Sequence, residues 1–208
     1  MRILIIQPKL EKAIQQLENE MHHNHTVDIV IFPEGYLNEN IEQACRLAKY
    51  YQIILIGGYR KLNDSPKDRA IIIDRTGEII LDRIKYSSTS SAQVEGLQIG
   101  HILCDELVVQ GIKQENVQPF DLVVHPIGVG MFSEEQFQEW IDEAQKIAVT
   151  YNTIIIGTSH ADGTFKNSNL SIPIAYCFNN RGEAVFIAKN DVRSIILDIQ
   201  STKVALVD

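Results

Sequence analysis

Short apolar runs alternate with amphipathic stretches along the first half of the chain. The segments "RILIIQP" (2–8), "DIVIFP" (28–33) and "QIILIGGYR" (52–60) are rich in isoleucine, leucine and valine and have the length of buried strands. Between them, "LEKAIQQLENEM" (10–21) and "NENIEQACRLAKYY" (38–51) have the spacing of amphipathic helices. The apolar face of the first helix would consist of Leu10, Ile14, Leu17 and Met21. Strands that alternate with helices in this way predict an α/β fold.

A hairpin follows, and then the same order of strands, helix and hairpin is repeated. The segment "AIIIDRTGEIILDRIK" (70–85) predicts two strands joined by a tight turn at Gly77. The later strands repeat the earlier ones and end in a second hairpin of the same pattern: "LQIGHILC" (97–104), "FDLVVHP" (120–126), "TIIIGTSHADG" (153–163) and "AYCFNNRGEAVFIAK" (175–189). The chain therefore reads as two pseudo-equivalent halves.

The helix of the second half carries its own start signal. In "SEEQFQEWIDEAQKIAVTYN" (133–152), Ser133 is followed three residues later by Gln136, which is the pattern of a capping box. Each half then supplies one sheet with helices on its outer face. Because the strands are apolar on both faces, we expect the two sheets to pack against each other within one domain, residues 1–208.

Composition narrows the functional classes. The 208 residues include 19 basic and 27 acidic ones, and this net charge of -8 argues against a surface that follows nucleic-acid phosphates. No apolar run has the ~18 residues that a membrane span requires. The N-terminal apolar run resembles a strand more than a signal peptide, so a cytoplasmic protein is expected. Three widely spaced cysteines without a CxxC pair fit a reduced compartment.

Chemically active residues stand where three predicted strands end. Glu34 follows "DIVIFP", Lys85 ends the first hairpin, and Cys104 ends "LQIGHILC". In α/β sheets, ligands collect beyond the carboxyl ends of the strands. A carboxylate at the end of a core strand is costly to desolvate unless another group pairs with it or uses it. We therefore expect these three side chains to share one site.

The three residue types together are sufficient for acyl transfer. A cysteine at a strand-to-helix turn faces backbone N–H groups and a helix N-terminus, which favour the thiolate. A carboxylate can accept the thiol proton and later activate water. A lysine, with a backbone N–H just past the nucleophile, can stabilise the oxyanion. The other cysteines, Cys45 in a helix and Cys177 in a strand, are predicted to pack in the interior.

These segments resemble the motifs of the nitrilase, or carbon-nitrogen hydrolase, superfamily. "DIVIFPEGYL" is similar to its glutamate motif, "GEIILDRIKY" to its lysine motif and "IGHILCDEL" to its cysteine motif, and the likeness extends over the whole chain. The resemblance implies a four-layer α-β-β-α sandwich and hydrolysis of non-peptide C–N bonds in a small amide or N-carbamoyl substrate. It further implies Glu34 as general base, Lys85 as oxyanion partner, Cys104 as nucleophile, and commonly a homodimer. We expect no cofactor and no metal.

Two features depart from this family pattern. Asp105 stands directly after the cysteine, where an aromatic residue is usual, and an inward-pointing carboxylate there would raise the pKa of the thiol. The segment between Lys85 and Cys104 is short, and Glu95 is the only acid in it, whereas relatives often carry a second pocket glutamate in a longer loop. The short loop predicts an open pocket, a different substrate range or loss of activity.

Further candidates follow from the strand ends. Tyr36, Asp105, His125 and Phe132 are predicted to contact the substrate, and Gly128, Met131 and Ser159 are predicted to line the same pocket. Two alternatives to a cysteine hydrolase remain open. One is a catalytically inactive binding or regulatory protein on the same scaffold. The other is a metal-dependent hydrolase with His101, His125 and His160 as ligands.

Overall fold

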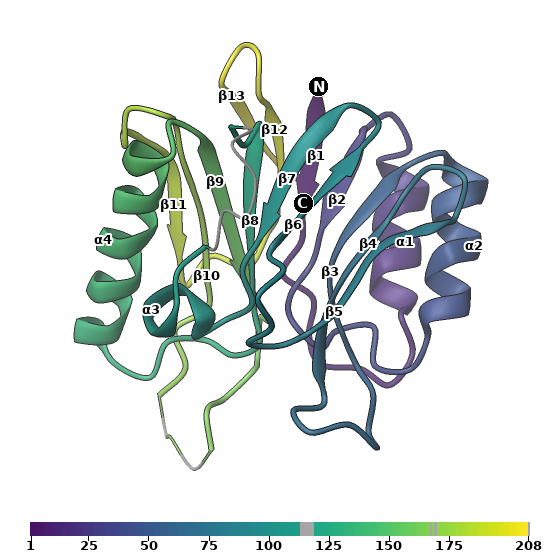
Figure 1. The fold of residues 1–208 in the computed structure, drawn as a ribbon, viewed down its shortest axis with the longest axis horizontal. Coiled ribbons are helices and arrows are strands. Elements are labelled where there is room, and N and C mark those ends of the chain that lie inside the picture. Colours follow the sequence, from purple (N-terminus) through teal and green to yellow (C-terminus); the bar gives the residue numbers. More distant parts are fainter. Residues whose placement is uncertain (113–118, 167, 169, 208) are drawn as a thin grey trace.

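Two β-sheets pack face to face in the computed structural model, which describes residues 1–112, 119–166, 168 and 170–207 (Figure 1). The first sheet has seven strands in the order β13-β12-β1-β2-β3-β4-β5. These strands are β1 (Arg2–Ile5), β2 (Ile29–Ile31), β3 (Ile54–Arg60), β4 (Asp68–Ile73), β5 (Ile79–Ile84), β12 (Ser194–Asp198) and β13 (Lys203–Val207). The three central strands β1, β2 and β3 are parallel, and their neighbours are antiparallel.

The second sheet has six strands in the order β11-β10-β9-β8-β7-β6. They are β6 (Ser91–Val94), β7 (Leu97–His101), β8 (Leu122–Ile127), β9 (Ile154–Ser159), β10 (Ile174–Phe178) and β11 (Ala184–Lys189). Again three parallel strands, β7, β8 and β9, are flanked by antiparallel ones. The series β7 to β11 therefore repeats the series β1 to β5, as the two predicted halves require.

Helices cover the outer face of each sheet. In Figure 1, α1 (Gln15–His23) and α2 (Ile41–Tyr51) lie outside the first sheet, and α4 (Glu134–Thr150) lies outside the second, with the short α3 (Glu106–Val109) beside the lower end of α4. The layers are thus helix, sheet, sheet and helix, which confirms the predicted α-β-β-α sandwich. No helix in the described part of the chain is long and apolar enough to cross a membrane.

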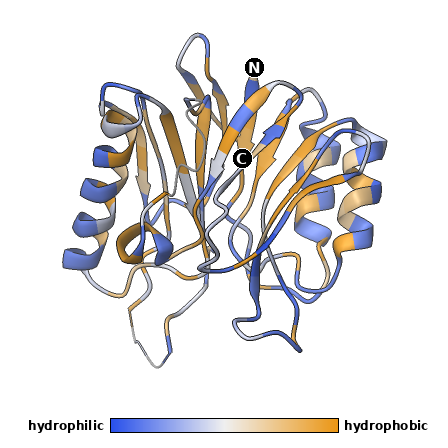
Figure 2. Ribbon diagram, viewed as in Figure 1, coloured by the Kyte–Doolittle hydropathy of each residue, from blue (hydrophilic) through white to orange (hydrophobic). Residues whose placement is uncertain are grey.

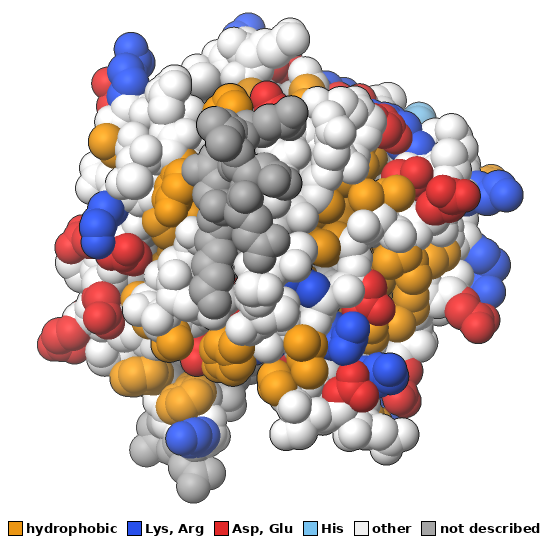
Figure 3. Space-filling model, in the orientation of Figure 1, with side chains coloured by type: hydrophobic (Ala, Val, Ile, Leu, Met, Phe, Trp, Pro, Cys, Tyr) orange, Lys and Arg blue, Asp and Glu red, His pale blue; other side chains and the backbone are white. Residues whose placement is uncertain are grey.

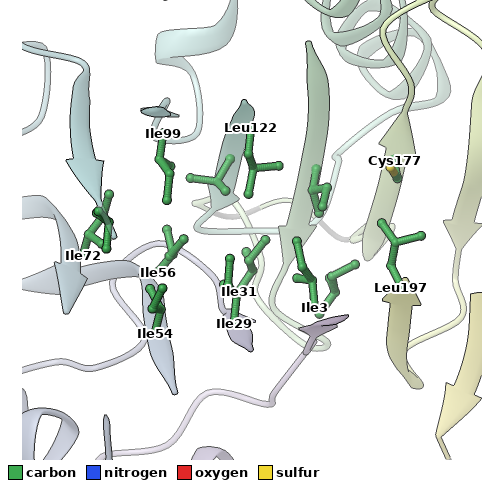
Figure 4. Close-up of a cluster of buried hydrophobic side chains, with 14 of the residues drawn as sticks. Ile3, Ile29, Ile31, Ile54, Ile56, Ile72, Ile99, Leu122, Cys177 and Leu197 are labelled. Atoms are coloured by element: carbon green, nitrogen blue, oxygen red, sulfur yellow. The ribbon is translucent and has the colours of Figure 1, made fainter. Parts of the chain in front are cut away.

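The inner strands, among them β1, β2, β3, β8, β9 and β10, are apolar along most of their length because both of their faces are buried. Ile29 and Ile31 of β2 face Leu122 of β8 between the sheets (Figure 4). The alternate residue Val30 points to the helices of its own half. Figure 2 shows the same pattern, with hydrophobic strands at the centre and helices that are hydrophilic on their outer side. Burial of both faces, at about 25 cal/mol per Å² of apolar surface, is the main force holding the layers together.

The structure differs from the sequence prediction at the start of α1 and at three strands. Helix α1 begins at Gln15, and Leu10 lies outside it with 52% of its surface exposed. The backbone N–H of Leu10 donates instead to Asp162 Oδ1 at 2.8 Å, so the segment before α1 is held by the other half of the molecule. The edge strands β6 and β13, and β12 next to β13, were not predicted. The capping prediction is confirmed, because Ser133 Oγ accepts the N–H of Gln136 at 3.1 Å.

Candidate active site

The three residues predicted to share a site line one cavity of about 900 Å³. Glu34 follows β2, Lys85 follows β5 and Cys104 follows β7, so both sheets contribute. The ends of these strands meet at the same side of the sandwich because the two halves repeat one topology. The structure therefore brings together side chains from segments that are far apart in the sequence.

Glu34 and Lys85 form a buried ion pair. Lys85 Nζ lies 2.8 Å from Glu34 Oε1, and the two residues are 9% and 5% exposed. Burial raises the pKa of the Glu34 carboxyl to about 7, and the positive charge of Lys85 opposes this shift only in part. Burial also disfavours the charged form of Lys85, but the negative charges around it and its hydrogen bonds to Glu34 and Asp105 together outweigh burial and raise the pKa of the ammonium group. Lys85 thus stays protonated, and Glu34 can change its protonation near neutral pH.

Glu34 is held from two further sides. His160 donates from Nε2 to the backbone oxygen of Glu34 at 3.1 Å. Gly128, after β8, leaves room for the carboxylate, because a Cβ at this position would lie 2.5 Å from Glu34 Oε2. Gly128 therefore determines where the carboxylate can lie.

Cys104 occupies a sharp turn between β7 and α3. Its φ of +46° lies in the left-handed region, which is uncommon for residues other than glycine. Its N–H donates to the oxygen of Pro126 at 2.9 Å, and its own oxygen accepts from His125 Nε2 at 2.7 Å. The other ring nitrogen of His125 accepts from the Tyr176 hydroxyl at 2.6 Å. These bonds fix the strained backbone and direct the thiol into the cavity.

The thiol is neutral at rest. Burial raises the pKa of the Cys104 thiol well above its usual value, and the negative charge of Glu34 raises it further. The backbone N–H of Gly128 and the charge of Lys85 act in the opposite direction but do not reverse the shift. The expectation of a thiolate stabilised by a helix N-terminus is therefore wrong, since α3 has only four residues. A proton acceptor must act when the sulfur attacks.

A second buried ion pair, not expected from the sequence, lies beneath the site. Arg83 of β5 binds Glu106 of α3 through two hydrogen bonds of 2.8 and 2.7 Å. The same carboxylate accepts the N–H of Leu103 at 2.7 Å and that of Tyr86 at 2.6 Å. Glu106 thus contacts the residue before Cys104 and the residue after Lys85. One carboxylate ties together the two turns that carry the nucleophile and the lysine.

Asp105 gives Lys85 a second carboxylate partner. Its Oδ1 lies 2.8 Å from Lys85 Nζ, and its Oδ2 accepts from the Tyr86 hydroxyl at 2.8 Å. Burial works against the charged form, but the hydrogen bonds from Lys85 and Tyr86 lower the pKa of Asp105 below its ordinary value. Glu95, the acid of the short loop, accepts from Arg75 and does not line the cavity. Of Glu95 and Asp105, it is therefore the acid directly after the nucleophile that lines the cavity.

The predicted substrate contacts fall into two groups. Asp105 and Phe132 line the cavity. Tyr36 does not line it, because its ring is buried and its hydroxyl points to Glu11 beside α1. His125 is fully buried and acts on the backbone of Cys104. Of the other residues predicted to line the pocket, Gly128 does so, whereas the prediction is wrong for Met131 and Ser159, which are buried outside the cavity.

The three histidines proposed as metal ligands each bind a backbone or hydroxyl oxygen. His101 Nε2 pairs with the oxygen of Gly57 at 2.9 Å, His125 with Cys104, and His160 with Glu34. Burial lowers the pKa of all three, so they are neutral. Within the described ranges, no three His, Cys, Asp or Glu side chains converge in a way that could hold a metal ion. The arrangement therefore gives no support to a metal-dependent hydrolase.

Comparison with known proteins agrees with this architecture. No family model and no curated protein matches the sequence. Among solved structures, a carbon-nitrogen hydrolase from Helicobacter pylori is similar, with a TM-score of 0.73, 13% identity and coverage of 97% of this chain and 90% of that one. A Saccharomyces cerevisiae member of branch 10 of the nitrilase superfamily gives a TM-score of 0.76, 14% identity and coverage of 97% and 91%. The chain has the nitrilase-superfamily fold.

A further structure on the nitrilase fold contains a modified cysteine. It is an amidase mutant from Nesterenkonia, in which acrylamide is bound covalently at the active-site cysteine. Its TM-score is 0.68 at 12% identity, and the match covers 96% of this chain and 93% of that one. At this level of identity the likeness concerns the fold alone. The chemistry of this chain must be argued from its own residues.

Proposed function

We propose that this protein hydrolyses a small amide or N-carbamoyl compound through a thioester on Cys104. One observation carries the proposal: a neutral thiol shares a cavity with the buried Glu34–Lys85 ion pair. Glu34 has a pKa of about 7 and can therefore exist as a proton acceptor at neutral pH. Lys85 keeps its charge and is available to the oxyanion. Burying an ion pair contributes little to the stability of a fold, so stability alone does not explain why these groups are buried together.

The reaction divides into two halves. As Cys104 Sγ forms a bond with the carbonyl carbon, its proton moves to Glu34 and the carbonyl oxygen takes the negative charge next to Lys85. Collapse of this intermediate breaks the C–N bond, and Glu34 passes the proton to the leaving amine. Water, deprotonated by Glu34, then attacks the thioester, and the proton returns to the sulfur as the acid leaves. Asp105 and Phe132 would contact the substrate at the cavity wall.

A covalent-adduct screen tests the proposal directly. Purified protein is incubated with a panel of small amides and N-carbamoyl compounds, quenched in acid, and examined by mass spectrometry for an acyl group on Cys104. We expect the adduct together with ammonia or amine release. Release without any adduct at Cys104, or the absence of both across the panel, would contradict the proposal.

Activity should increase with pH through about 7, the pKa of Glu34. Below this value Glu34 is protonated and cannot accept the thiol proton, and above it the carboxylate form is present. Replacing Asp105 by asparagine should move the midpoint to lower pH, because the charge of Asp105 raises the pKa of Glu34. The measurement is kcat/KM from pH 5 to 9 for the wild type and the variant. A profile that stays flat across neutral pH would speak against Glu34 as the base.

Gly128→Ala should reduce turnover far more than stability. The added methyl group would lie 2.5 Å from Glu34 Oε2 and push the carboxylate aside, while the backbone at this position has no unusual φ. A displacement of about 1 Å near reacting atoms can lower activity roughly 100-fold, and overpacking costs about 1–3 kcal/mol. Measurements of kcat/KM and Tm separate these effects. Unchanged kcat/KM would show that the position of Glu34 does not depend on Gly128.

A further inference from the structure

We propose that the substrate carries a positive charge at the far end of an apolar spacer, and that amides bearing a free carboxylate are poor substrates. This inference rests on the proposed hydrolase function and specifies its substrate class. Four properties of the cavity support it. Its cationic side chains are paired with carboxylates, its carboxylates outnumber its cations, one wall is apolar, and its volume is large.

Both cationic side chains that line the cavity are already paired. Lys85 lies between Glu34 and Asp105, with both N···O distances at 2.8 Å. Arg60 Nε lies 3.1 Å from Asp68 Oδ1. Among the described lining residues there is no other lysine, arginine or histidine. Among these lining residues, a substrate carboxylate would therefore meet only cations whose charge a carboxylate of the protein already balances.

Carboxylates outnumber these cations. The lining residues include five acids: Glu34, Asp68, Asp105, Glu135 and Glu139. Even with Glu34 protonated, the lining residues carry four negative charges and two positive ones.

Glu135 and Glu139 are four residues apart on α4, so they share one helix face, and both are exposed. Neither has an ion-pair partner among the described residues, whereas Glu134 pairs with Lys189 and Glu143 with Lys146. These two side chains form an anionic rim without a counter-charge.

An apolar wall belongs to the same cavity. The rings of Phe132 and Phe165 are stacked, with centroids 5.4 Å apart and an angle of 27° between the planes. Together with Val108 and Tyr86 they are exposed, although large apolar side chains are usually buried. Figure 3 shows hydrophobic side chains gathered beside α3, the helix that carries Val108. Such a wall suits a methylene chain or a flat apolar group.

The volume shows that the substrate extends well past the reacting carbonyl. Ligand pockets of roughly 300–1,000 Å³ accommodate whole drug-sized molecules. At about 900 Å³, this cavity would be mostly water-filled around an amide of acetamide size. A longer substrate can place its amide at Cys104, its spacer against Phe132 and Phe165, and its charge near Glu135 and Glu139. This geometry makes an amine-bearing amide the best fit.

Three amides of equal chain length test the proposal: 6-aminohexanamide, hexanamide and adipic acid monoamide. We expect kcat/KM, measured by ammonia release, to fall at least about tenfold from the amine to the neutral amide and again to the carboxylate. The differences should shrink at high ionic strength, because salt screens exposed charges. If the carboxylate compound is hydrolysed as well as or better than hexanamide, the inference is wrong. If none of the three is hydrolysed and none acylates Cys104, the proposed function itself fails.

A pair of variants locates the effect. The double substitution Glu135→Gln and Glu139→Gln should reduce the ratio of kcat/KM for 6-aminohexanamide over hexanamide at least about tenfold, because it removes the two unpaired rim charges. Glu143→Gln removes a charge from the same helix outside the cavity and should leave that ratio unchanged. An unchanged ratio in the double variant, or an equal loss in Glu143→Gln, would overturn the assignment of the rim.

Discussion

Replacing Cys104 by alanine is expected to abolish hydrolysis, with a loss of at least about 10⁴-fold in kcat, since no other group can form the thioester. The fold should persist, because the change removes one sulfur atom at the cavity wall and leaves the backbone bonds of this turn to Pro126 and His125 in place. Turnover, acyl labelling and Tm are measured on the same preparation. Cys45→Ala and Cys177→Ala serve as controls, since these cysteines lie outside the cavity.

Alkylation by iodoacetamide distinguishes an active nucleophile from an inert thiol. Burial raises the pKa of Cys104, of Cys45 and of Cys177, so simple ionisation would leave all three slow. If Glu34 accepts the proton during attack, Cys104 should react well before the others, and Glu34→Gln should slow Cys104 alone. Retained turnover in Cys104→Ala would refute the assignment. Uniformly slow alkylation would favour a binding protein that has kept the scaffold.

Breaking the Arg83–Glu106 pair should have the second largest effect. Both side chains are nearly fully buried, at 4% and 1% exposure, so Arg83→Met or Glu106→Leu leaves an uncompensated charge in the interior. Loss of one partner of a buried pair costs about 3–5 kcal/mol, which for a chain of this size lowers Tm by roughly 6–20 °C. Lys146→Met, which breaks an exposed pair with Glu143, is the control and should cost less than about 1 kcal/mol.

The double variant Arg83→Met/Glu106→Leu distinguishes the contribution of this ion pair to stability from its role in positioning Cys104 and Lys85. Removing both charges should restore much of the Tm, because apolar replacements of a buried pair are often neutral. Turnover should nevertheless stay low, since the N–H groups of Leu103 and Tyr86 lose the carboxylate that holds the turns of Cys104 and Lys85. Recovery of both Tm and kcat/KM in the double variant would show that the pair stabilises the fold without aligning the site.

The central strands and their repetition could be predicted from sequence because the cause is local. A strand buried on both faces requires continuous apolar residues, and β1 to β3 and β7 to β9 carry most of that pattern in the same order, each series followed by a hairpin. The edge strands β6 and β13 carry less of it, since much of their surface is polar or exposed, and β12, which is mostly buried, was also not predicted. The start of α1 also escaped prediction. Leu10 is held by Asp162, which is 152 residues away in the sequence.

The sequence by itself determined which segments form the strands β1 to β5 and β7 to β11, and that Glu34, Lys85 and Cys104 stand at strand ends. Only the tertiary structure decided what each side chain faces. Tyr36 follows the same strand as Glu34 but turns toward α1, and His125 holds the backbone of Cys104 instead of a substrate. The protonation of Cys104 depends on burial and on charges brought from distant segments. The hydrophobic periodicity of the sequence indicates which residues are buried. The direction in which a side chain points, and the charges that lie next to it, are set only when the two halves pack together.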